Sequence, residues 1–292
     1  MHQKQLTIFT PTYNRARLLP RLYESICRQD SNDFLWLIVD DGSTDNTRQL
    51  VTAWQQEAKV EIVYHRQENG GKMRAHNTGV ALCETPLFLC IDSDDWFSSP
   101  TAVSDTLHFW HQHAETVQRE DICGMISFKS IDNKTCRYPQ DVETTSLTAL
   151  YESGFEGETA IMFKTDIIRQ YPFPVADGEK FVTEAVVFDL LDSRYQMLLF
   201  PYYSQTCEYQ QDGYTRSGMD LIYQSPKGYR LFYNQRVALK HKDWRYNTQM
   251  YIALSLLIGD GNIFSLASNK WLTLMLFPMG LYQYYKLKHR KW

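Results

Sequence analysis

Three short apolar runs in the first hundred residues each end at a polar or acidic stretch, and this arrangement limits the possible folds more than any other feature. The runs cover residues 6–9, 36–39 and 87–91. Between them lie segments such as residues 17–29, whose apolar side chains recur at the spacing of one helix face. Strands and helices that alternate with short connections predict an α/β fold with a doubly wound, mostly parallel sheet flanked by helices.

The polar stretches follow the carboxyl ends of these predicted strands. Residues 10–15 follow the first run, residues 40–45 follow the second, and the third run leads to Asp92, Asp94 and Asp95. Ligands of open α/β sheets bind beyond the carboxyl ends of the strands. The sequence therefore predicts one binding site to which all three stretches contribute.

Asp92, Asp94 and Asp95 form a dense group of carboxylates at the end of a buried strand. Like charges this close repel one another, and each carboxylate prefers water to a protein interior. A divalent cation would make the group favourable, and Mg²⁺ or Mn²⁺ suits hard oxygen ligands while keeping positions open for phosphate oxygens. The alternative is a solvated acidic turn before a helix that begins near Pro100.

Composition and absent motifs narrow the class of ligand. The formal net charge of −4 provides no overall polycation for nucleic acid to bind. The chain has no G-x-G-x-x-G after its first strand, no G-x-x-x-x-G-K-[ST], no H-E-x-x-H and no G-x-S-x-G. These absences argue against a dinucleotide dehydrogenase and a P-loop enzyme, and favour a site that holds a nucleotide through carboxylates and a metal.

Cysteine spacing and the start of the sequence bear on the cellular compartment. The six cysteines form no C-x-x-C pair and read as reduced thiols. The first residues lead directly into a predicted strand, without the pattern of a signal peptide. We therefore expect a cytoplasmic protein.

Four motifs in the first hundred residues carry a resemblance to a known family. They are Thr-Pro-Thr-Tyr-Asn-Arg at 10–15, Val-Asp-Asp-Gly-Ser-Thr-Asp at 39–45, Glu-Asn-Gly-Gly at 68–71, and Asp-Ser-Asp-Asp at 92–95. In order and spacing the sequence resembles glycosyltransferase family 2, whose members have the GT-A fold. Residues 209–215 are similar to the segment that follows the acceptor region in many bacterial members. The resemblance implies a Rossmann-like, mostly parallel sheet with a helical C-terminal extension.

The resemblance also implies a nucleotide-sugar donor, most often a UDP-sugar. Pro11 and Tyr13 would line the base pocket, and Asp41 would accept a hydrogen bond from the uracil imide. A carboxylate at that position favours uracil, because it would leave a cytosine ring nitrogen unpaired. The alternative for Asp41 is a helix cap, although we expect Ser43 or Thr44 to cap the following helix.

The remaining donor contacts implied by the resemblance involve charged residues. Arg15 and Lys72 would approach the ribose or the diphosphate, although each could equally be a surface charge. Asp92 would face the ribose as well as the metal, and Asp94 would ligate the metal. Asp95 would either support these ligands or be a further one. A Mn²⁺ or Mg²⁺ ion would neutralise the departing diphosphate as a Lewis acid.

Inverting transfer by this family requires a carboxylate that takes the proton of the acceptor hydroxyl. Glu184 stands where the family has an acidic pair at the start of a helix, although its neighbour Ala185 replaces the second acid. We expect Thr183 to cap that helix, with Glu184 at its rim as the base. Glu179 and Asp189 are alternatives for the base, and Glu184 could instead serve only as a first-turn acid.

The character of the chain changes from Pro226 onward. Residues 271–285 carry no charge and are followed by a basic tail, but the run is short for a membrane-spanning helix and we expect Pro278 to interrupt it. Two interpretations remain open for residues 271–292: a helix packed on the catalytic domain or in a homodimer interface, and a helix on the inner face of the cell membrane.

These observations predict a catalytic domain over 1–225 and a helical extension over 226–292. Within the domain, residues 1–100 form the nucleotide-binding half and residues 101–225 the acceptor-side half. The leading interpretation is an inverting, metal-dependent glycosyltransferase with a glycan or lipid-linked acceptor in polysaccharide biosynthesis. The alternatives are a non-catalytic nucleotide- or glycan-binding domain, which Ala185 favours, and a sugar nucleotidyltransferase, against which the absence of glycine from 10–15 argues.

Overall fold

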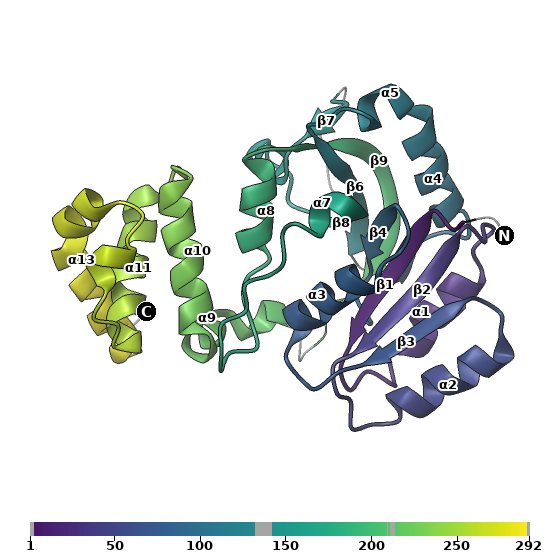
Figure 1. Ribbon diagram of the computed structural model, residues 1–292, viewed down its shortest axis with the longest axis horizontal. Helices are drawn as coiled ribbons and strands as arrows, with labels where there is room; N and C mark the ends of the chain where they lie inside the picture. Colours follow the sequence, from purple (N-terminus) through teal and green to yellow (C-terminus); the bar gives the residue numbers. More distant parts are fainter. Residues whose placement is uncertain (1–2, 132–141, 209, 211–213, 291–292) are drawn as a thin grey trace. The chain divides into compact units, whose positions relative to one another are not determined.

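A computed structural model describes residues 3–131, 142–208, 210 and 214–290, without the side chains of 214–217. The motif at 209–215 therefore lies largely outside the described residues. The chain forms two compact units, which are treated separately (Figure 1). Unit 1 comprises Met1–Pro172 and Arg194–Gln211, and unit 2 comprises Phe173–Ser193 and Asp212–Trp292. We expected a division at residue 225, whereas the segment Phe173–Ser193 groups with the C-terminal helices.

Unit 1 is built on one nine-stranded sheet, in the order β3-β2-β1-β4-β8-β6-β9-β5, with β7 paired to β9. The bounds of the strands are β1 Leu6–Thr12, β2 Phe34–Asp40, β3 Ile62–Arg66, β4 Leu87–Cys90, β5 Trp96–Phe97, β6 Ile122–Ile131, β7 Thr144–Thr145, β8 Glu158–Lys164 and β9 Gln196–Cys207.

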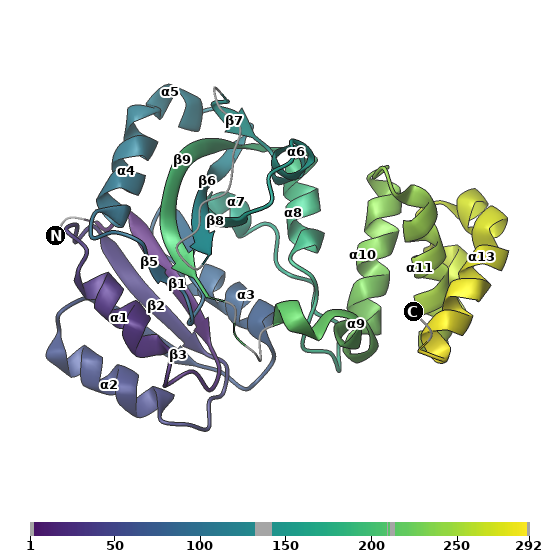
Figure 2. The same ribbon diagram turned by 180° about the vertical axis from the view of Figure 1, so that it is seen from behind.

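Most strands of this sheet run in one direction. β1 is parallel to β2 and β4, and β2 is parallel to β3. β8 is antiparallel to both β4 and β6, so β6 runs with β4, and β9 is parallel to β6. Only β5, β7 and β8 oppose this direction in the described residues. The predicted α/β fold with a mostly parallel sheet is confirmed (Figure 2).

Helices cover both faces of the sheet in unit 1. They are α1 Leu19–Cys27, α2 Thr47–Glu57, α3 Lys72–Leu82, α4 Ala102–Gln112, α5 Ala114–Val117, α6 Leu147–Glu152 and α7 Thr165–Ile168. Alternate residues of β1 face opposite layers. Ile8 lies in the core with α1 and α2, whereas Phe9 contacts His76 of α3 with ring centroids 5.6 Å apart. Stacked rings of Tyr23 and Trp54, 4.2 Å apart, join α1 to α2.

The start of α1 suits the residues of its first turn, whereas the start of α2 differs from the prediction. α1 begins at Leu19 with Pro20 in its first turn, where the missing proline N–H costs nothing. We expected Ser43 or Thr44 to cap the next helix, but α2 begins at Thr47. Asp45 Oδ1 accepts the Thr47 N–H at 3.0 Å, while the Ser43 hydroxyl accepts a hydrogen bond from a different loop. The capping prediction was therefore wrong.

The sequence patterns did not predict β5, β7 or β9. β9 is a long strand that contains Pro201 and whose pairing with β6 includes register shifts. A proline and bulges interrupt the regular alternation on which strand prediction depends.

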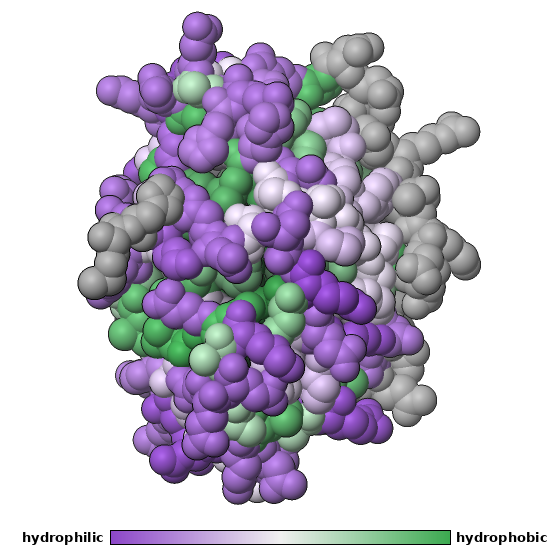
Figure 3. Space-filling view, turned by 90° about the vertical axis from the view of Figure 1, so that its right-hand side faces the viewer, coloured by the Kyte–Doolittle hydropathy of each residue, from purple (hydrophilic) through white to green (hydrophobic). Residues whose placement is uncertain are grey.

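Figure 3 shows one face of the molecule, on which hydrophilic residues predominate and hydrophobic residues gather in a band across the middle.

Unit 2 contains helices and no strands in its described residues. Its helices are α8 Ala185–Asp192, α9 Tyr214–Gln224, α10 Pro226–Ala238, α11 Trp244–Ile258, α12 Ile263–Leu266 and α13 Lys270–Lys288. The backbone of α9 is broken at Gly218. α13 packs closely on α11, because a Cβ atom added at Gly280 would lie 2.5 Å from Ile252.

The prediction that Pro278 interrupts the last helix was wrong. α13 is 19 residues long in total and continues past Pro278 without a break. Proline lacks the N–H that would bond to the preceding turn. Pro278 lies on the exposed side of the helix, where water can hydrogen-bond the carbonyl left without that donor, while Gly280 keeps the opposite side tight against α11.

Candidate functional site

The sheet register brings the three predicted polar stretches to one edge. Thr12 pairs with Asp40, and Phe9 pairs with Cys90, so β1, β2 and β4 end side by side. The backbone continues these pairings beyond the strands: Asp41 N–H donates to Thr12 O at 2.8 Å. The expected meeting of the stretches at the carboxyl edge is therefore present in the structure.

The loop after β1 is tied to the loop after β2. Asn14, with a left-handed backbone at φ 54°, donates its N–H to Ser43 Oγ at 2.9 Å and accepts the Thr44 N–H at 2.8 Å. Pro11 is buried within β1, whereas the Tyr13 side chain is 45% exposed. Tyr13 therefore presents an accessible ring at this edge, as its predicted contact with a base requires. The burial of Pro11 does not test its predicted contact with the base.

The carboxylate of Asp41 is engaged by the segment after β3. Oδ1 accepts hydrogen bonds from Gln67 Nε2 at 2.7 Å and from Gly70 N–H at 2.9 Å. Oδ2 accepts from Gly71 N–H at 2.7 Å and from Asn69 Nδ2 at 3.1 Å. A carboxylate has about four acceptor positions, and these four donors occupy them.

This arrangement gives Asp41 a structural role of its own. It holds the turn that precedes α3, and this role differs from the helix cap that we considered for it, because Gly71 precedes the first residue of α3. An imide N–H of uracil would have to replace one of the present donors. The amide side chains of Gln67 and Asn69 can move more readily than the backbone of Gly71, which adopts φ 94°.

Two lysines neutralise the acidic stretch after β4. Lys72, the first residue of α3, places its ammonium nitrogen 2.8 Å from Asp92 Oδ1. Lys129 of β6 lies 2.6 Å from Asp95 Oδ2 and 3.9 Å from Asp92 Oδ2. Lys129 takes part in the charge balance of this site, and the sequence patterns did not predict it. The available signal was a lysine within an otherwise apolar or small-residue strand.

Charge compensation sets the protonation of this group. Burial acts to raise the pKa of Asp92, but the ammonium groups of Lys72 and Lys129 outweigh it and lower the pKa to about 2. Burial alone would lower the pKa of Lys129, yet the carboxylates of Asp95 and Asp92 raise it above its usual range. Asp92 is therefore ionised and Lys129 protonated at neutral pH.

Asp94 differs from its two neighbours. Burial and the charge of Asp92 raise the pKa of Asp94, against the opposing effect of Arg15 and Lys72. No ion pair joins the Asp94 carboxylate to a side chain in the described part of the chain. Its backbone is held in place, because Arg21 donates to Asp94 O at 3.0 Å and stacks over the Trp96 ring at 3.6 Å.

The predicted metal ligands do not all converge. Within residues 3–131, 142–208, 210 and 214–290, no group of three or more carboxylate, imidazole or thiol side chains is arranged to hold a metal ion. Asp95 is 5% exposed and its carboxylate is paired with Lys129. Asp94 alone still fits Mg²⁺ or Mn²⁺, which proteins often hold through one or two carboxylates together with phosphate oxygens.

A buried histidine lies behind the acidic stretch. The His76 ring is in edge contact with Phe9 and Phe88, with centroids 5.6 and 5.4 Å away. Burial and the charge of Lys72 lower the pKa of His76 to about 3. His76 is therefore neutral at physiological pH and packs as a core residue.

The three candidate bases all lie in unit 2, at or near α8. Glu184 is half-buried at the N-cap position of α8 and makes no capping hydrogen bond, so the predicted cap at Thr183 was wrong. The approach of Glu184 to the acidic stretch of unit 1 remains a prediction. Glu179 instead accepts the N–H groups of Lys227 and Gly228 at 2.8 and 2.9 Å.

Asp189 also forms an ion pair within unit 2. Its carboxylate pairs with Arg236 of α10, with Asp189 Oδ2 2.7 Å from Arg236 Nε and Oδ1 3.3 Å from Arg236 Nη2. Glu179 and Asp189 thus each fix the start or the side of α10. The choice of Glu184 as the base remains a prediction.

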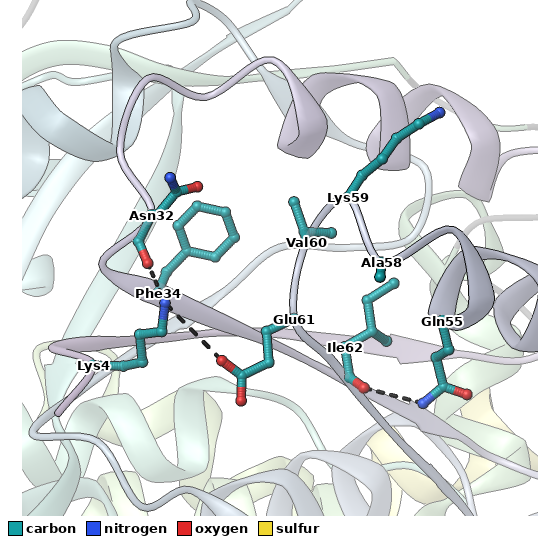
Figure 4. Close-up of a pocket in the computed structure, with 9 residues that line it drawn as sticks. All are labelled: Lys4, Asn32, Phe34, Gln55, Ala58, Lys59, Val60, Glu61 and Ile62. Atoms are coloured by element: carbon teal, nitrogen blue, oxygen red, sulfur yellow. Dashed lines mark hydrogen bonds and ion pairs between the residues drawn. The ribbon is translucent and has the colours of Figure 1, made fainter. Parts of the chain in front are cut away.

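Grooves elsewhere in unit 1 do not compete with this site. One is lined by Lys4, Asn32, Phe34 and residues from 55 to 62, at the amino ends of β1, β2 and β3 (Figure 4). Its polar groups bond to each other, as Lys4 does to Asn32 O and Gln55 to Ile62 O. Ligands of α/β sheets bind at the opposite edge.

Comparisons of sequence place the chain among glycosyltransferases. An uncharacterised glycosyltransferase of Nostoc sp., alr2836, is 26% identical over 182 residues, which cover 59% of this chain and 54% of that protein. The poly(ribitol-phosphate) beta-N-acetylglucosaminyltransferase TarS of Staphylococcus aureus is 28% identical over 115 residues, which cover 39% of this chain and 20% of TarS. The chain spans about half the length, or less, of the curated relatives that it matches.

Comparisons of structure identify a fold that this chain shares with solved glycosyltransferases. TarS residues 1–349, crystallised with UDP-GlcNAc, superpose with a TM-score of 0.64 at 16% identity, covering 97% of this chain and 81% of that one. The mannosyltransferase PcManGT of Pyrobaculum calidifontis, in complex with GDP-Man and Mn²⁺, gives a TM-score of 0.56 at 16% identity, covering 100% and 89%. The predicted GT-A fold is therefore confirmed.

The family model for glycosyl transferase family 2 matches residues 7–171. This span begins in β1, includes all four motifs and the acidic stretch, and ends after α7. Since it covers more than half of the 292 residues, the chain belongs to glycosyl transferase family 2.

Proposed function

We propose that the protein transfers a sugar from a UDP-sugar to a glycan or lipid-linked acceptor in polysaccharide biosynthesis, with inversion and with a divalent cation. The observation that carries this proposal is the contrast within the acidic stretch. Lysines neutralise Asp92 and Asp95. Asp94 is half-buried, and no ion pair joins its carboxylate to a side chain in the described residues. A cation at Asp94 would relieve the burial of that charge.

The donor diphosphate would be held by the positive groups beside this carboxylate. Arg15 and Lys72 are both close enough to Asp94 to lower its pKa. Lys72 is also the first residue of α3, and a helix N-terminus favours an anion. A bound Mn²⁺ or Mg²⁺ ion would supply Lewis-acid stabilisation of the leaving diphosphate. The complexes of TarS with UDP-GlcNAc and of PcManGT with GDP-Man and Mn²⁺ support this donor class.

Base recognition would use the loops after β1 and β2. The exposed Tyr13 ring offers a stacking surface beside the buried Pro11. We propose that uracil bonds to Asp41 by replacing an amide donor of Gln67 or Asn69. Exchange of one N–H donor for another preserves the hydrogen bonding of the buried carboxylate, so its energetic cost is small.

Proton removal from the acceptor would be the role of Glu184. A carboxylate that accepts this proton as the hydroxyl attacks accelerates such a step by about 10²–10⁴-fold. The neighbouring Ala185 cannot provide a second acid, and this favours one alternative, a domain that binds the donor without turning it over. Turnover by the intact protein, lost in Glu184→Gln while UDP binding is kept, separates the two.

Calorimetric titration tests the donor site directly. We expect UDP to bind more tightly with Mn²⁺ than without it, and more tightly than CDP or GDP. Asp94→Asn should abolish the effect of Mn²⁺, whereas the exposed control Asp166→Asn should preserve it. Equal binding of the three nucleotides would refute uracil recognition. A Mn²⁺ effect that persists in Asp94→Asn would refute the metal role of Asp94.

A further inference from the structure

The last helix of unit 2 exposes more large apolar side chains than its surroundings require. Its outward residues are between 44% and 82% exposed, and they are Trp271, Leu274, Met275, Met279, Leu281, Tyr282 and Tyr285. Single exposed apolar residues are ordinary on protein surfaces, but a contiguous group indicates an interaction site.

These side chains share one face of α13. At 100° per residue, Trp271, Met275 and Tyr282 lie within 40° of one another around the helix axis. The buried residues of the helix, which include Thr273, Leu276, Gly280 and Leu287, occupy the opposite face and pack toward α11. The helix is therefore apolar on both sides, with only one side covered in unit 2.

The charge of this region has a single sign. No Asp or Glu follows Asp260 in the sequence, whereas Lys270, Lys286, Lys288, Arg290 and Lys291 do. Lys286 lies over the ring of Tyr282 at 6.0 Å and Lys288 over the ring of Tyr284 at 5.6 Å. The basic groups thus border the apolar face and are positioned beside its aromatic rings.

We propose that the outward face of α13 binds the surface of a membrane that contains anionic lipids. Trp and Tyr side chains are favoured at the boundary between lipid tails and headgroups, and lysines beside them attract anionic headgroups. Helices of this kind lie in the plane of the interface. No helix among the described residues is long and apolar enough to cross a bilayer, so α13 lies on the membrane and does not span it.

Charge complementarity favours a lipid surface over a second copy of the chain. Two copies that pack these faces together would bring basic side chains near each other, and α13 contains no carboxylate to pair with them. An anionic bilayer supplies both the apolar interior and the opposite charge. Binding there would hold the chain where lipid-linked acceptors reside, but the inference rests on α13 alone and not on the proposed sugar transfer.

Co-sedimentation of the full-length protein with vesicles tests the proposal. We expect binding to vesicles of phosphatidylcholine with 30% phosphatidylglycerol (about one lipid in three, which gives a surface potential sufficient to attract lysines) and little binding to phosphatidylcholine alone. Trp271→Ser/Met275→Ser/Tyr282→Ser should weaken binding by about 100-fold or more, because three large apolar side chains no longer enter the interface.

Two further variants sharpen this test. Lys286→Gln/Lys288→Gln should weaken binding by about fivefold for each lysine and reduce its salt dependence. The control Leu82→Ser/Leu231→Ser changes side chains that are 42% and 39% exposed but lie outside α13, and should bind as the wild type does. Circular dichroism and thermal unfolding establish that each variant is folded.

Three outcomes would overturn the proposal. The first is a folded wild-type protein that binds neither type of vesicle. The second is a triple variant that binds as tightly as the control. The third is a wild-type dimer, measured by light scattering, that the triple variant converts to a monomer without any vesicle binding by the wild type, which would assign the face to a second copy. None of these readouts depends on glycosyl transfer, so the proposal can fail independently of the proposed function.

Discussion

The two groups of carboxylates in this protein are stabilised by different means. In unit 1, ammonium groups neutralise Asp92 and Asp95 at the edge of the sheet. In unit 2, backbone N–H groups of α10 satisfy Glu179, and the guanidinium of Arg236 satisfies Asp189. The proposed roles toward a ligand belong to one further carboxylate in each unit, Asp94 in unit 1 and Glu184 in unit 2. The comparison therefore predicts that loss of a partnered acid affects stability, whereas loss of Asp94 or Glu184 affects binding or transfer.

Glu184, the proposed base in the second group, should show the largest effect. Glu184→Gln keeps the size and hydrogen-bonding capacity of the side chain but removes its basicity. We expect transfer to fall by about 10²–10⁴-fold with unchanged UDP affinity and unchanged thermal stability. Asp189→Asn and Glu179→Gln should retain the pH dependence of transfer. Turnover by Glu184→Gln within threefold of wild type would place the base elsewhere.

The buried cation of the first group should dominate its stability. Lys129→Met removes the charge that compensates Asp95 and part of the charge that compensates Asp92. We expect the free energy of unfolding to fall by about 3–5 kcal/mol, because a buried carboxylate loses its partner. Urea denaturation measures the change. Lys59→Met, which removes the lysine of an exposed pair with Glu57, is the control and should leave the free energy of unfolding nearly unchanged.

A double variant separates charge compensation from packing at this position. Lys129→Met/Asp95→Leu removes both members of the pair, and we expect it to recover much of the lost stability, because apolar replacement of a buried ion pair is often close to neutral. No recovery in the double variant would mean that Lys129 acts mainly through Asp92.

The neutral histidine behind the first group predicts a pH dependence. The pKa of His76 is about 3 in the folded protein, below its ordinary value of 6.5. The unfolded chain therefore binds more protons between these pH values, so stability rises with pH in this window and is fully present above pH 6.5. We expect His76 to contribute on the order of 3–5 kcal/mol to the loss of stability as pH falls through the window.

His76→Gln should flatten this part of the stability curve, measured by urea denaturation at intervals of pH. His111→Gln, at an exposed site on α4, should leave the slope unchanged. An unchanged slope in His76→Gln would mean that other groups, such as the carboxylates of the acidic stretch, account for the acid sensitivity.

The ion pair of the second group should have the smallest of these effects. Asp189 and Arg236 are partly buried, with side chains 11% and 24% exposed. We expect Asp189→Asn to lower the free energy of unfolding by about 1–2 kcal/mol, because a charge-assisted pair becomes a weaker neutral hydrogen bond. If the loss matched that of Lys129→Met, the contrast between the two groups would not hold.

The fold of the first hundred residues was predictable because local signals there agree with the tertiary structure. Apolar runs became β1, β2 and β4, and the Leu-rich segment with Pro20 became α1. Each of these elements buries most of its apolar residues in the core of unit 1. Periodicity and turn chemistry are strong signals under those conditions.

The unpredicted features depend on partners distant in sequence. Lys129 is 34 residues from Asp95, and only the pairing of β6 within the sheet places it beside the acidic stretch. The Asp41 carboxylate is bound by donors 26 to 30 residues away. The irregular strand β9 forms because β6 provides its pairing partner. No local pattern specifies contacts of this kind.

Gly280 separates the constraints on the two sides of α13. Its contact with Ile252 leaves no room for even one additional carbon atom, so the inner side tolerates almost no change in volume. The outer side is exposed at Trp271, Met275 and Tyr282, so substitutions there leave the packing against α11 intact. Drift in the sequence can therefore alter what the outer side contacts while the fold of unit 2 is inherited unchanged.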